Sequence, residues 1–231
     1  MKEIFDIKKI MIASMGSGSG KTIFTCGLVR TLKKQGMRVH PFKSGPDYID
    51  PMYLSRAAGE PCRNLDIFLQ GEDGVRRTFL RGCATDSDED IAVIEAAMGY
   101  YDGVAGTDEA SAYSIAKLFD VPVILLIKPS GSSMSLAAQI KGMMDFRPDS
   151  NISGIVMTDC SKKYYEHLKP LIESECGLTV FGFLPHVKEA EFSSRHLGLY
   201  MAGEYEDIDD RFLAISDEIL ENVDVQGICC L

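Results

Sequence analysis

The amino-acid sequence predicts an α/β fold in which a mostly parallel central sheet is flanked by helices. Two observations lead to this expectation: short apolar segments that lack the polar alternation of a half-exposed strand, and helical patterns that separate them. The order strand, helix, strand repeats along the chain, as expected of parallel strands joined by crossover helices. We therefore expect three layers, helix, sheet and helix, in a single domain over residues 1–231.

Six apolar segments carry the pattern expected of buried strands. They lie at residues 9–13, 39–42, 90–95, 121–127, 152–157 and 179–184. Apolar residues three or four positions apart predict helices between and after them. These helices are expected at residues 110–119, 133–146, 162–175 and 209–221. Residues 45–51 and 63–66 are expected to form long functional loops around a short helix.

A glycine-rich loop follows the first strand and precedes an amphipathic helix that carries Phe24, Leu28 and Leu32 on one face. Gly36 is expected to end this helix in a left-handed conformation. A phosphate site needs backbone N–H groups directed at one point, a helix N-terminus, a lysine for the outer phosphates and a hydroxyl for magnesium. The loop offers all four. Its candidate nucleotide-binding residues are Gly16, Ser17, Gly18, Ser19, Gly20, Lys21 and Thr22.

The loop departs from the standard phosphate-loop pattern, G-x-x-x-x-G-K-[ST], at one position. The pattern requires glycine at position 15, where this chain has Met15. A glycine- and serine-rich turn with an accidental lysine is the alternative interpretation. The position of the loop, between a buried strand and an amphipathic helix, favours a nucleotide site over that alternative.

Composition limits the classes of partner. Apolar residues make up 45% of the chain and charged residues 25%, the balance of a globular protein, and no apolar run approaches the ~18 residues of a membrane span. With 34 acidic and 24 basic side chains the net charge is −10, which argues against nucleic acid. The seven scattered cysteines and the absence of a signal-peptide pattern predict a cytoplasmic protein without a disulfide framework.

Five motifs, in order along the chain, carry a family resemblance: ASMGSGSGKT, HPFKSGPDYIDP, RNLD, VIEAAMGYYDG and RHLGL. Together they resemble the N-terminal ATP-binding domain of cobyrinic acid a,c-diamide synthase, in the superfamily of dethiobiotin synthetases and MinD-like ATPases. The resemblance implies a P-loop NTPase fold, ATP and Mg²⁺ as cofactors, and an ATP-dependent carbon–nitrogen ligase (amidoligase) that acts on carboxylates of a corrinoid or related tetrapyrrole.

Acidic and basic residues near the predicted strand ends are the candidates for chemistry. Thr22, Asp47 and Glu95 are expected to hold the metal, because parallel strands bring their carboxyl ends to one edge of the sheet. Lys43 is expected to bridge the γ-phosphate and the incoming carboxylate, with a surface lysine as the alternative. By resemblance, Asp50 and Asp102 join Lys43, Asp47 and Glu95 in catalysis. Weaker candidates for shaping the substrate side are Ser44, Gly45, Tyr48, Arg63 and Asn64.

The chain departs from the family where the base should bind. The family has Asn-Arg after the predicted strand at 152–157, which helps to read adenine, and this chain has Thr158-Asp159. Thr158 is retained as a cofactor-binding candidate. The family has aspartate after the strand at 121–127, where this chain has Lys128-Pro129, and Ala96 replaces a family glycine.

The family joins this domain to a C-terminal glutaminase domain, which the 231 residues do not include. A fragment, a separate glutaminase subunit and a different chemistry are therefore all open, and a homodimer is a further expected assembly. Two rival functions remain: a carboxylase like dethiobiotin synthetase, and a MinD-like ATPase switch. The switch family has a lysine near the start of the loop, where this chain has Ser14 and Met15, which counts against the switch.

Overall fold

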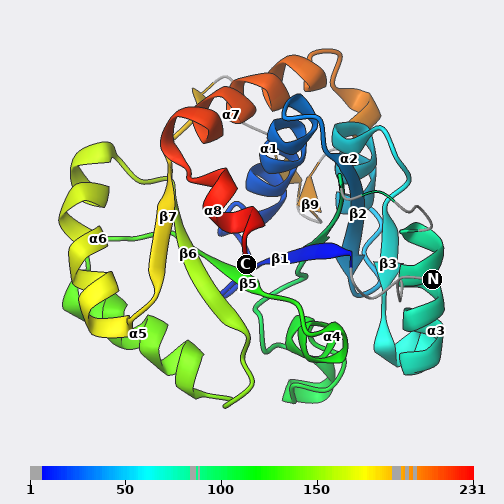
Figure 1. The fold of residues 1–231 in the computed structure, drawn as a ribbon, viewed down its shortest axis with the longest axis horizontal. Helices are drawn as coiled ribbons and strands as arrows, with labels where there is room; N and C mark the ends of the chain where they lie inside the picture. Colours follow the sequence, from blue (N-terminus) through cyan, green and yellow to red (C-terminus); the bar gives the residue numbers. More distant parts are fainter. Residues whose placement is uncertain (1–6, 84–86, 88, 189–193, 196–197, 200–201) are drawn as a thin grey trace.

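A computed structural model describes residues 7–83, 87, 89–188, 194–195, 198–199 and 202–231. Its centre is a sheet of seven parallel strands in the order β3-β2-β4-β1-β5-β6-β7 (Figure 1). The strands are β1 (Lys8–Ser14), β2 (Arg38–Ser44), β3 (Arg63–Leu65), β4 (Asp90–Glu95), β5 (Val123–Ile127), β6 (Ile152–Thr158) and β7 (Thr179–Leu184). The expected parallel sheet is confirmed.

Helices cover both faces of the sheet, so the expected three layers are also confirmed (Figure 1). One face carries α1 (Lys21–Lys34), α2 (Asp50–Ala58), α7 (Ile208–Asn222) and α8 (Val225–Cys229). The other carries α3 (Ile67–Gly82), α4 (Ala112–Phe119), α5 (Met134–Asp145) and α6 (Lys162–Cys176). Short 3₁₀ segments are η2 (Val104–Gly106) and η4 (Ala202–Glu204), and β8 (Ser194–Arg195) pairs with β9 (Gly198–Leu199) antiparallel.

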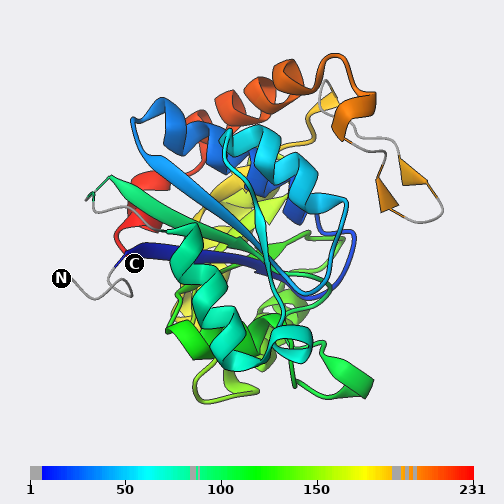
Figure 2. The same cartoon turned by 90° about the vertical axis from the view of Figure 1, so that its right-hand side faces the viewer.

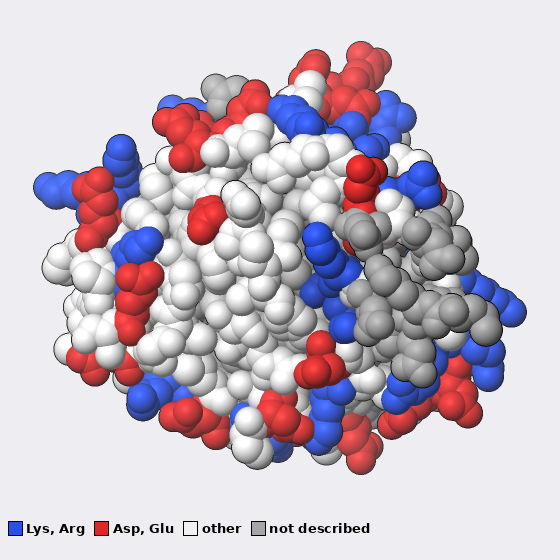
Figure 3. All heavy atoms as spheres, viewed as in Figure 1, with Lys and Arg blue, Asp and Glu red and all other residues white. Residues whose placement is uncertain are grey.

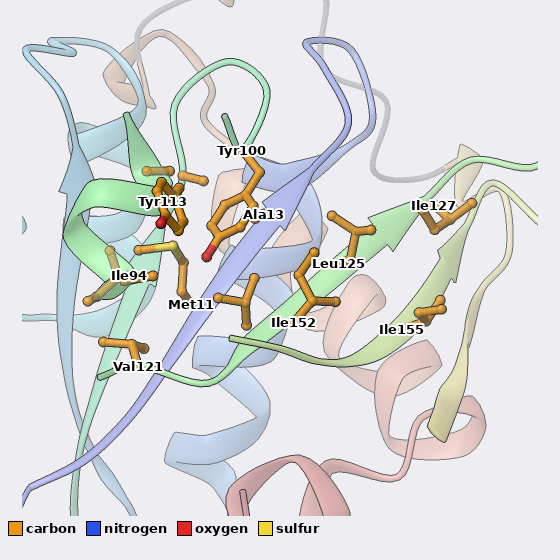
Figure 4. Close-up of a cluster of buried hydrophobic side chains, with 14 of the residues drawn as sticks. Met11, Ala13, Ile94, Tyr100, Tyr113, Val121, Leu125, Ile127, Ile152 and Ile155 are labelled. Atoms are coloured by element: carbon orange, nitrogen blue, oxygen red, sulfur yellow. The ribbon is translucent and has the colours of Figure 1, made fainter. Parts of the chain in front are cut away.

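Strands buried on both faces explain the unbroken apolar runs of the sequence. Every residue of β4 and of β5 is buried. Alternate residues of one strand pack against opposite helical layers: Met11 and Ala13 lie in the cluster under α3–α6 (Figure 4). Ile12, between them, lies in the cluster under α1. Such strands cannot show the polar alternation of a strand with one wet face.

The structure differs from the sequence predictions in two places. Residues 63–65 form the edge strand β3 and not a loop, because they pair with the end of β2. Helix α3, which no predicted segment includes, follows directly and is capped by the Asp66 side chain. Asp90, the first residue of β4, is buried and lies 3.1 Å from the Nε2 of His40.

The loops that follow the parallel strands gather at one edge of the sheet. Figure 2 shows both termini on the side where β1 begins and these loops on the opposite side. The register places Lys43 of β2 opposite Glu95 of β4 and Asn64 of β3. This edge therefore brings together residues that are far apart in the sequence.

No helix of the described chain is long and apolar enough to cross a membrane.

Helices α1 and α7 approach each other closely at Gly27. A Cβ atom at this position would lie 2.9 Å from the Cδ1 of Ile219 and would clash with Ile215, whose side chain is fully buried. Both isoleucines belong to the core on that face of the sheet. The absence of a side chain at position 27 is therefore what allows α7 to lie against the helix of the glycine-rich loop.

We expect Gly27→Ala to lower the free energy of unfolding by up to about 2 kcal/mol, because overpacking costs about 1–3 kcal/mol and the helix-propensity gain is about 1 kcal/mol. Gly142→Ala is the matched control: position 142 is also helical, and a Cβ there meets no atom within 4 Å. The control should gain about 0.5–1 kcal/mol. Urea denaturation of both variants measures the difference, and equal stability in the two would contradict the close packing.

Candidate nucleotide and carboxylate site

The glycine-rich loop turns from the end of β1 into the start of α1. Gly18 and Gly20 have φ angles of 77° and 79°, a left-handed conformation that glycine adopts without strain. Ser19 Oγ donates to the carbonyl of Gly16 at 3.0 Å, which ties the turn together. The loop thus lies directly before the N-terminus of a helix of 14 residues, where free backbone N–H groups and the helix dipole favour an anion.

Lys21 points back into the loop and not into solvent. Its Nζ donates to Ser14 Oγ at 2.8 Å, to the Gly16 carbonyl at 3.1 Å and to the Met98 carbonyl at 2.7 Å. Burial, with a smaller contribution from Lys43, lowers the pKa of Lys21 to about 8. Its three partners are uncharged oxygens, so an anionic phosphate would be a stronger hydrogen-bond partner than any of them.

Lys43 is the buried cation at the centre of the site. The residue is only 2% exposed, and its Nζ lies 2.6 Å from Glu95 Oε1 and 2.6 Å from Asp50 Oδ2. Burial by itself lowers the pKa of Lys43, but the carboxylates of Glu95 and Asp50 outweigh burial and raise it above its ordinary value. Lys43 therefore stays protonated. Its burial excludes the interpretation of a solvated surface lysine.

Glu95 joins the phosphate loop to this cation. Thr22 Oγ1 donates to Glu95 Oε1 at 2.8 Å, so one carboxylate oxygen serves both Thr22 and Lys43. The other oxygen, Oε2, is buried and has no hydrogen-bond partner among the residues that the structure describes. An unpartnered buried carboxylate oxygen is costly, and a divalent cation is a ligand that would satisfy it. The donor set of Thr22 and Glu95 therefore fits Mg²⁺.

Asp47 and Asp50 come from the loop between β2 and α2. Asp47 Oδ1 accepts from the backbone N–H groups of Ile49 and Asp50 at 2.9 and 3.2 Å, while its Oδ2 lies 3.7 Å from Lys43 Nζ. Burial and the nearby Asp50 carboxylate raise the pKa of Asp47. Asn64 Nδ2 holds the loop by donating to the carbonyls of Gly45 and Asp47 at 2.8 and 2.7 Å.

The loop after β4 supplies Asp102 and the Met98 carbonyl. Asp102 Oδ2 accepts from the backbone N–H of Gly99 at 3.1 Å, and a Cβ atom at Gly99 would lie 2.6 Å from the Met15 carbonyl. The loop after β4 therefore packs directly on the phosphate loop. Asp102 lies near enough to Lys21 to raise the pKa of that lysine slightly, while its side chain bonds within its own loop, to the Gly99 N–H.

Thr158 lies on the other side of the phosphate loop, at the end of β6. Its Oγ1 donates to the Ser19 carbonyl at 3.0 Å. A hollow of about 230 Å³ opens beside this contact, and its walls include Gly18, Thr158 and Asp159. Asp159 Oδ2 lies 2.6 Å from Lys128 Nζ and its Oδ1 lies 3.3 Å from His186 Nδ1. The hydrogen bond from Lys128 lowers the pKa of Asp159.

The predicted site residues thus fall into three groups. Lys43, Asp50, Glu95 and Thr22 form one contiguous cluster with Asp47 at its edge. Lys21, the first residue of α1, contacts the loop after β4, which carries Asp102, and Thr158 lies apart from both groups. Among the weaker candidates, Asn64 and Ser44 brace the site: Ser44 Oγ accepts from the Ala97 N–H at 2.8 Å. Tyr48 is 72% exposed, and His196 of the RHLGL motif lies outside the described residues.

Sequence reasoning missed three parts of the site: Ser14, the Met98 carbonyl, and His186 on the wall of the small hollow. Ser14 could have been found, because it is the last residue of the strand that enters the glycine-rich loop. A backbone carbonyl such as that of Met98 leaves no signal in residue types. The contact of His186 with Asp159 joins residues that are far apart in the sequence, so it leaves no local pattern either.

Comparison with known proteins identifies the family. The family model described as the CobQ/CobB/MinD/ParA nucleotide binding domain matches residues 10–199. The chain belongs to this family. The glycine-rich loop that contacts Lys21 and Thr22 is thus the phosphate loop of a nucleotide-binding domain, and the P-loop fold and the family resemblance expected from the sequence are confirmed.

Curated relatives match nearly the whole chain. A cobyrinate a,c-diamide synthase of Clostridium tetani is 39% identical over 96% of this chain and 49% of its own length. One from Streptococcus sanguinis is 40% identical over 89% of this chain and 46% of its own length. A hydrogenobyrinate a,c-diamide synthase of Streptomyces coelicolor is 37% identical over 96% and 46%. The chain spans about half the length of the curated relatives it matches.

Solved structures support the fold. Chloroplast FtsY from Physcomitrella patens is similar with a TM-score of 0.56 and 13% identity, covering 90% of this chain and 65% of that one. The MinC:MinD cell division protein complex of Aquifex aeolicus includes a chain with a TM-score of 0.54 and 14% identity, covering 80% of this chain and 84% of that one. At such low identity the similarity supports the fold alone.

The environment of Lys21 predicts the pH dependence of nucleotide binding. Its pKa is about 8 in the free protein, and bound phosphate favours the charged lysine and raises that pKa. Nucleotide affinity should therefore hold below pH 8 and fall about tenfold per pH unit above it, until the pKa of the bound state is reached. Calorimetry from pH 7 to 9.5 measures this decline.

Lys21→Ala is the control for this measurement. It should bind nucleotide much more weakly, because Lys21 is the cation of the described loop that faces inward, and its affinity should lack the decline above pH 8. Undiminished affinity in the variant, or the same decline with pH in both proteins, would contradict the role of Lys21.

Proposed function

We propose that this chain is an ATP- and Mg²⁺-dependent synthetase that activates carboxylates of a corrinoid for amidation, as in cobyrinate a,c-diamide synthase. The observation that carries the proposal is the buried Lys43, held between Glu95 and Asp50 beside the phosphate loop. The names of relatives that match nearly the whole chain support the substrate class. Because those relatives are about twice as long, a glutaminase is expected on a separate polypeptide or segment.

Lys43 has the position expected of a cation that guides one anion toward another. It stands at the end of β2, next to the strand whose Glu95 contacts Thr22 of the phosphate loop. A protonated amine there attracts both the γ-phosphate and an incoming carboxylate and offsets their mutual repulsion. Asp50 and Glu95 hold the amine in place and keep it charged.

Mg²⁺ would be held by Thr22, Glu95 and Asp47, the last of which lies at the edge of the cluster. When bound, the metal would neutralise charge on the β- and γ-phosphates. Glu95 suits this role because its Oε2 is buried without a partner in the described chain. Asp102 supports the loop after β4 and adds negative charge near Lys21, which helps to keep that lysine protonated.

The proposed reaction has two steps that balance in atoms and charge. A substrate carboxylate oxygen attacks the γ-phosphorus, a new P–O bond forms, and the bond to the β-phosphate oxygen breaks to release ADP. Ammonia then attacks the carbonyl carbon of the acyl phosphate, loses a proton, and expels inorganic phosphate as the amide forms. Lys43 stays protonated through both steps, because its pKa lies above its ordinary value; it is a charge stabiliser and no proton donor.

Two rival functions use the same fold. A carboxylase like dethiobiotin synthetase would also activate an acid with ATP, and a MinD-like switch would hydrolyse ATP without a carboxylate. The Lys43–Asp50–Glu95 cluster favours an enzyme that must hold two anions together, because a switch has only the phosphates to stabilise. The assay described below separates the three.

We expect Asp47→Asn and Glu95→Gln to retain nucleotide affinity within about tenfold but to lose phosphoryl transfer by about 100-fold or more. Each variant weakens the metal site and leaves the phosphate loop intact. Single-turnover ADP formation measures the loss. Asp217→Asn is the matched control, because this exposed carboxylate pairs with Lys34 away from the site. Turnover near that of the parent in both site variants would remove Asp47 and Glu95 from the metal site.

The chain should form amide from cobyrinate with ammonium and ATP, but not with glutamine, because carboxylate activation and ammonia release are separable steps. ADP and amide are measured with ammonium, with glutamine, and with a panel of corrinoid and tetrapyrrole acids. Amide from glutamine with this chain alone would contradict the need for a separate glutaminase. ATP consumption that no carboxylate changes would favour the switch, and bicarbonate-dependent product from a diamine would favour the carboxylase.

A further inference from the structure

Exposed apolar side chains concentrate in the loops beside the Lys43 cluster. Ten large apolar residues of the described chain are exposed, and five of them follow the carboxyl ends of the neighbouring strands β2, β3 and β4. These five are Tyr48, Phe68, Leu69, Met98 and Val104, with exposures of 72%, 69%, 67%, 59% and 40%. Concentrated exposed apolar surface marks a binding site more often than chance scatter does.

These residues are built into the same loops as the proposed catalytic groups. Tyr48 follows Asp47 directly, and Met98 is the residue whose carbonyl accepts from Lys21. Val104 is two residues beyond Asp102. Tyr48, Met98 and Val104 therefore belong to the same loops as Asp47 and Asp102.

Hydrogen bonds hold this apolar surface in its exposed position. Asn64 fixes the loop of Tyr48 through two backbone carbonyls, and the Asp66 side chain caps the first turn of α3, which carries Phe68. The Val104 N–H donates to the Glu109 carbonyl at 3.0 Å. Burial of apolar side chains is favourable, so a flexible loop would bury them. Apolar side chains that hydrogen bonds keep exposed therefore indicate a partner that covers them.

Phe68 and Val104 face a common hollow of about 980 Å³ between α3, η2 and α4. Figure 2 shows the first turn of α3 and the η2 segment at the same end of the molecule. The volume lies at the upper end of the range for small-molecule sites, about 300–1,000 Å³. The walls combine apolar residues with charges of both signs, and two cations there, Lys117 and Arg147, pair with Asp149 and Asp108. The hollow therefore suits a ligand that has both apolar and polar parts.

We propose that Tyr48, Phe68, Met98 and Val104 form an apolar rim that binds the body of a large, flat, apolar ring system, while one carboxylate at the edge of that ring reaches Lys43. The proposal rests on the proposed function and adds which residues select the substrate. Aromatic side chains and a methionine suit this task, because they offer large contact area to a ring face and adapt to its outline.

The test measures binding of cobyrinate by equilibrium dialysis with Mg²⁺ and a non-hydrolysable ATP analogue, so that it does not depend on turnover. The double variant Phe68→Ser/Val104→Ser removes two exposed apolar side chains of the rim, 69% and 40% exposed, and leaves Met98 and its contact with Lys21 unchanged. We expect the Kd for cobyrinate to rise at least tenfold, with the Kd for the ATP analogue within twofold of the parent.

The control is Leu213→Ser/Leu220→Ser, which removes two exposed apolar side chains, 40% and 45% exposed, from α7. It should leave the cobyrinate Kd within twofold. An unchanged Kd in the rim variant, or an equal rise in the control, would overturn the proposal. Failure of the parent chain to bind cobyrinate would also overturn it, while ATP-dependent activation of another carboxylate would leave the proposed chemistry standing. Unchanged binding combined with lost activation by an added glutaminase would assign the rim to a protein partner and refute the substrate role.

Discussion

The site depends on one buried ion cluster, in which Lys43 lies between Glu95 and Asp50. Burying Lys43 and Glu95, and partly burying Asp50, is costly, and the cost is offset only while every member keeps its partner; loss of one partner of a buried pair costs about 3–5 kcal/mol. The parallel sheet meets this condition by register, because Lys43 and Glu95 are opposite residues on hydrogen-bonded strands. The backbone of the sheet therefore fixes the geometry of the cluster.

The same cluster organises its surroundings. Glu95 reaches Thr22 and so ties β4 to the first turn of α1, while Asp50 ties β2 to the first turn of α2. The two helices lie on the same face of the sheet (Figure 1). Charge is otherwise spread over the surface: on the face in Figure 3, basic and acidic side chains are interspersed and lie mostly toward the edge of the view. The concentration of charge that matters for chemistry is internal.

Much of this arrangement could be predicted from the sequence, for identifiable reasons. Buried strands such as β4 and β5 are apolar throughout, and the glycine-rich loop has a recognisable spacing, so the sheet and the phosphate loop were both predictable. Strand β3 was not, because three residues at a sheet edge carry no periodic pattern. The Met98 carbonyl and the unpartnered Glu95 Oε2 were not predictable either, because both are properties of the folded backbone and of burial, which residue types do not encode.

The contact between Lys21 and the Met98 carbonyl has a thermodynamic consequence. An ammonium group has three protons, and Lys21 already uses them on Ser14, Gly16 and Met98. A phosphate that takes Lys21 must displace one of these oxygens, and release of the Met98 carbonyl would loosen the segment that also carries Asp102. Linkage makes the effect reciprocal. A molecule that holds this segment away from Lys21 strengthens nucleotide binding, and bound nucleotide strengthens the binding of that molecule by the same factor. The loop after β4 can thus couple nucleotide binding to the binding of a second molecule at this segment, so that each binds more tightly once the other is bound.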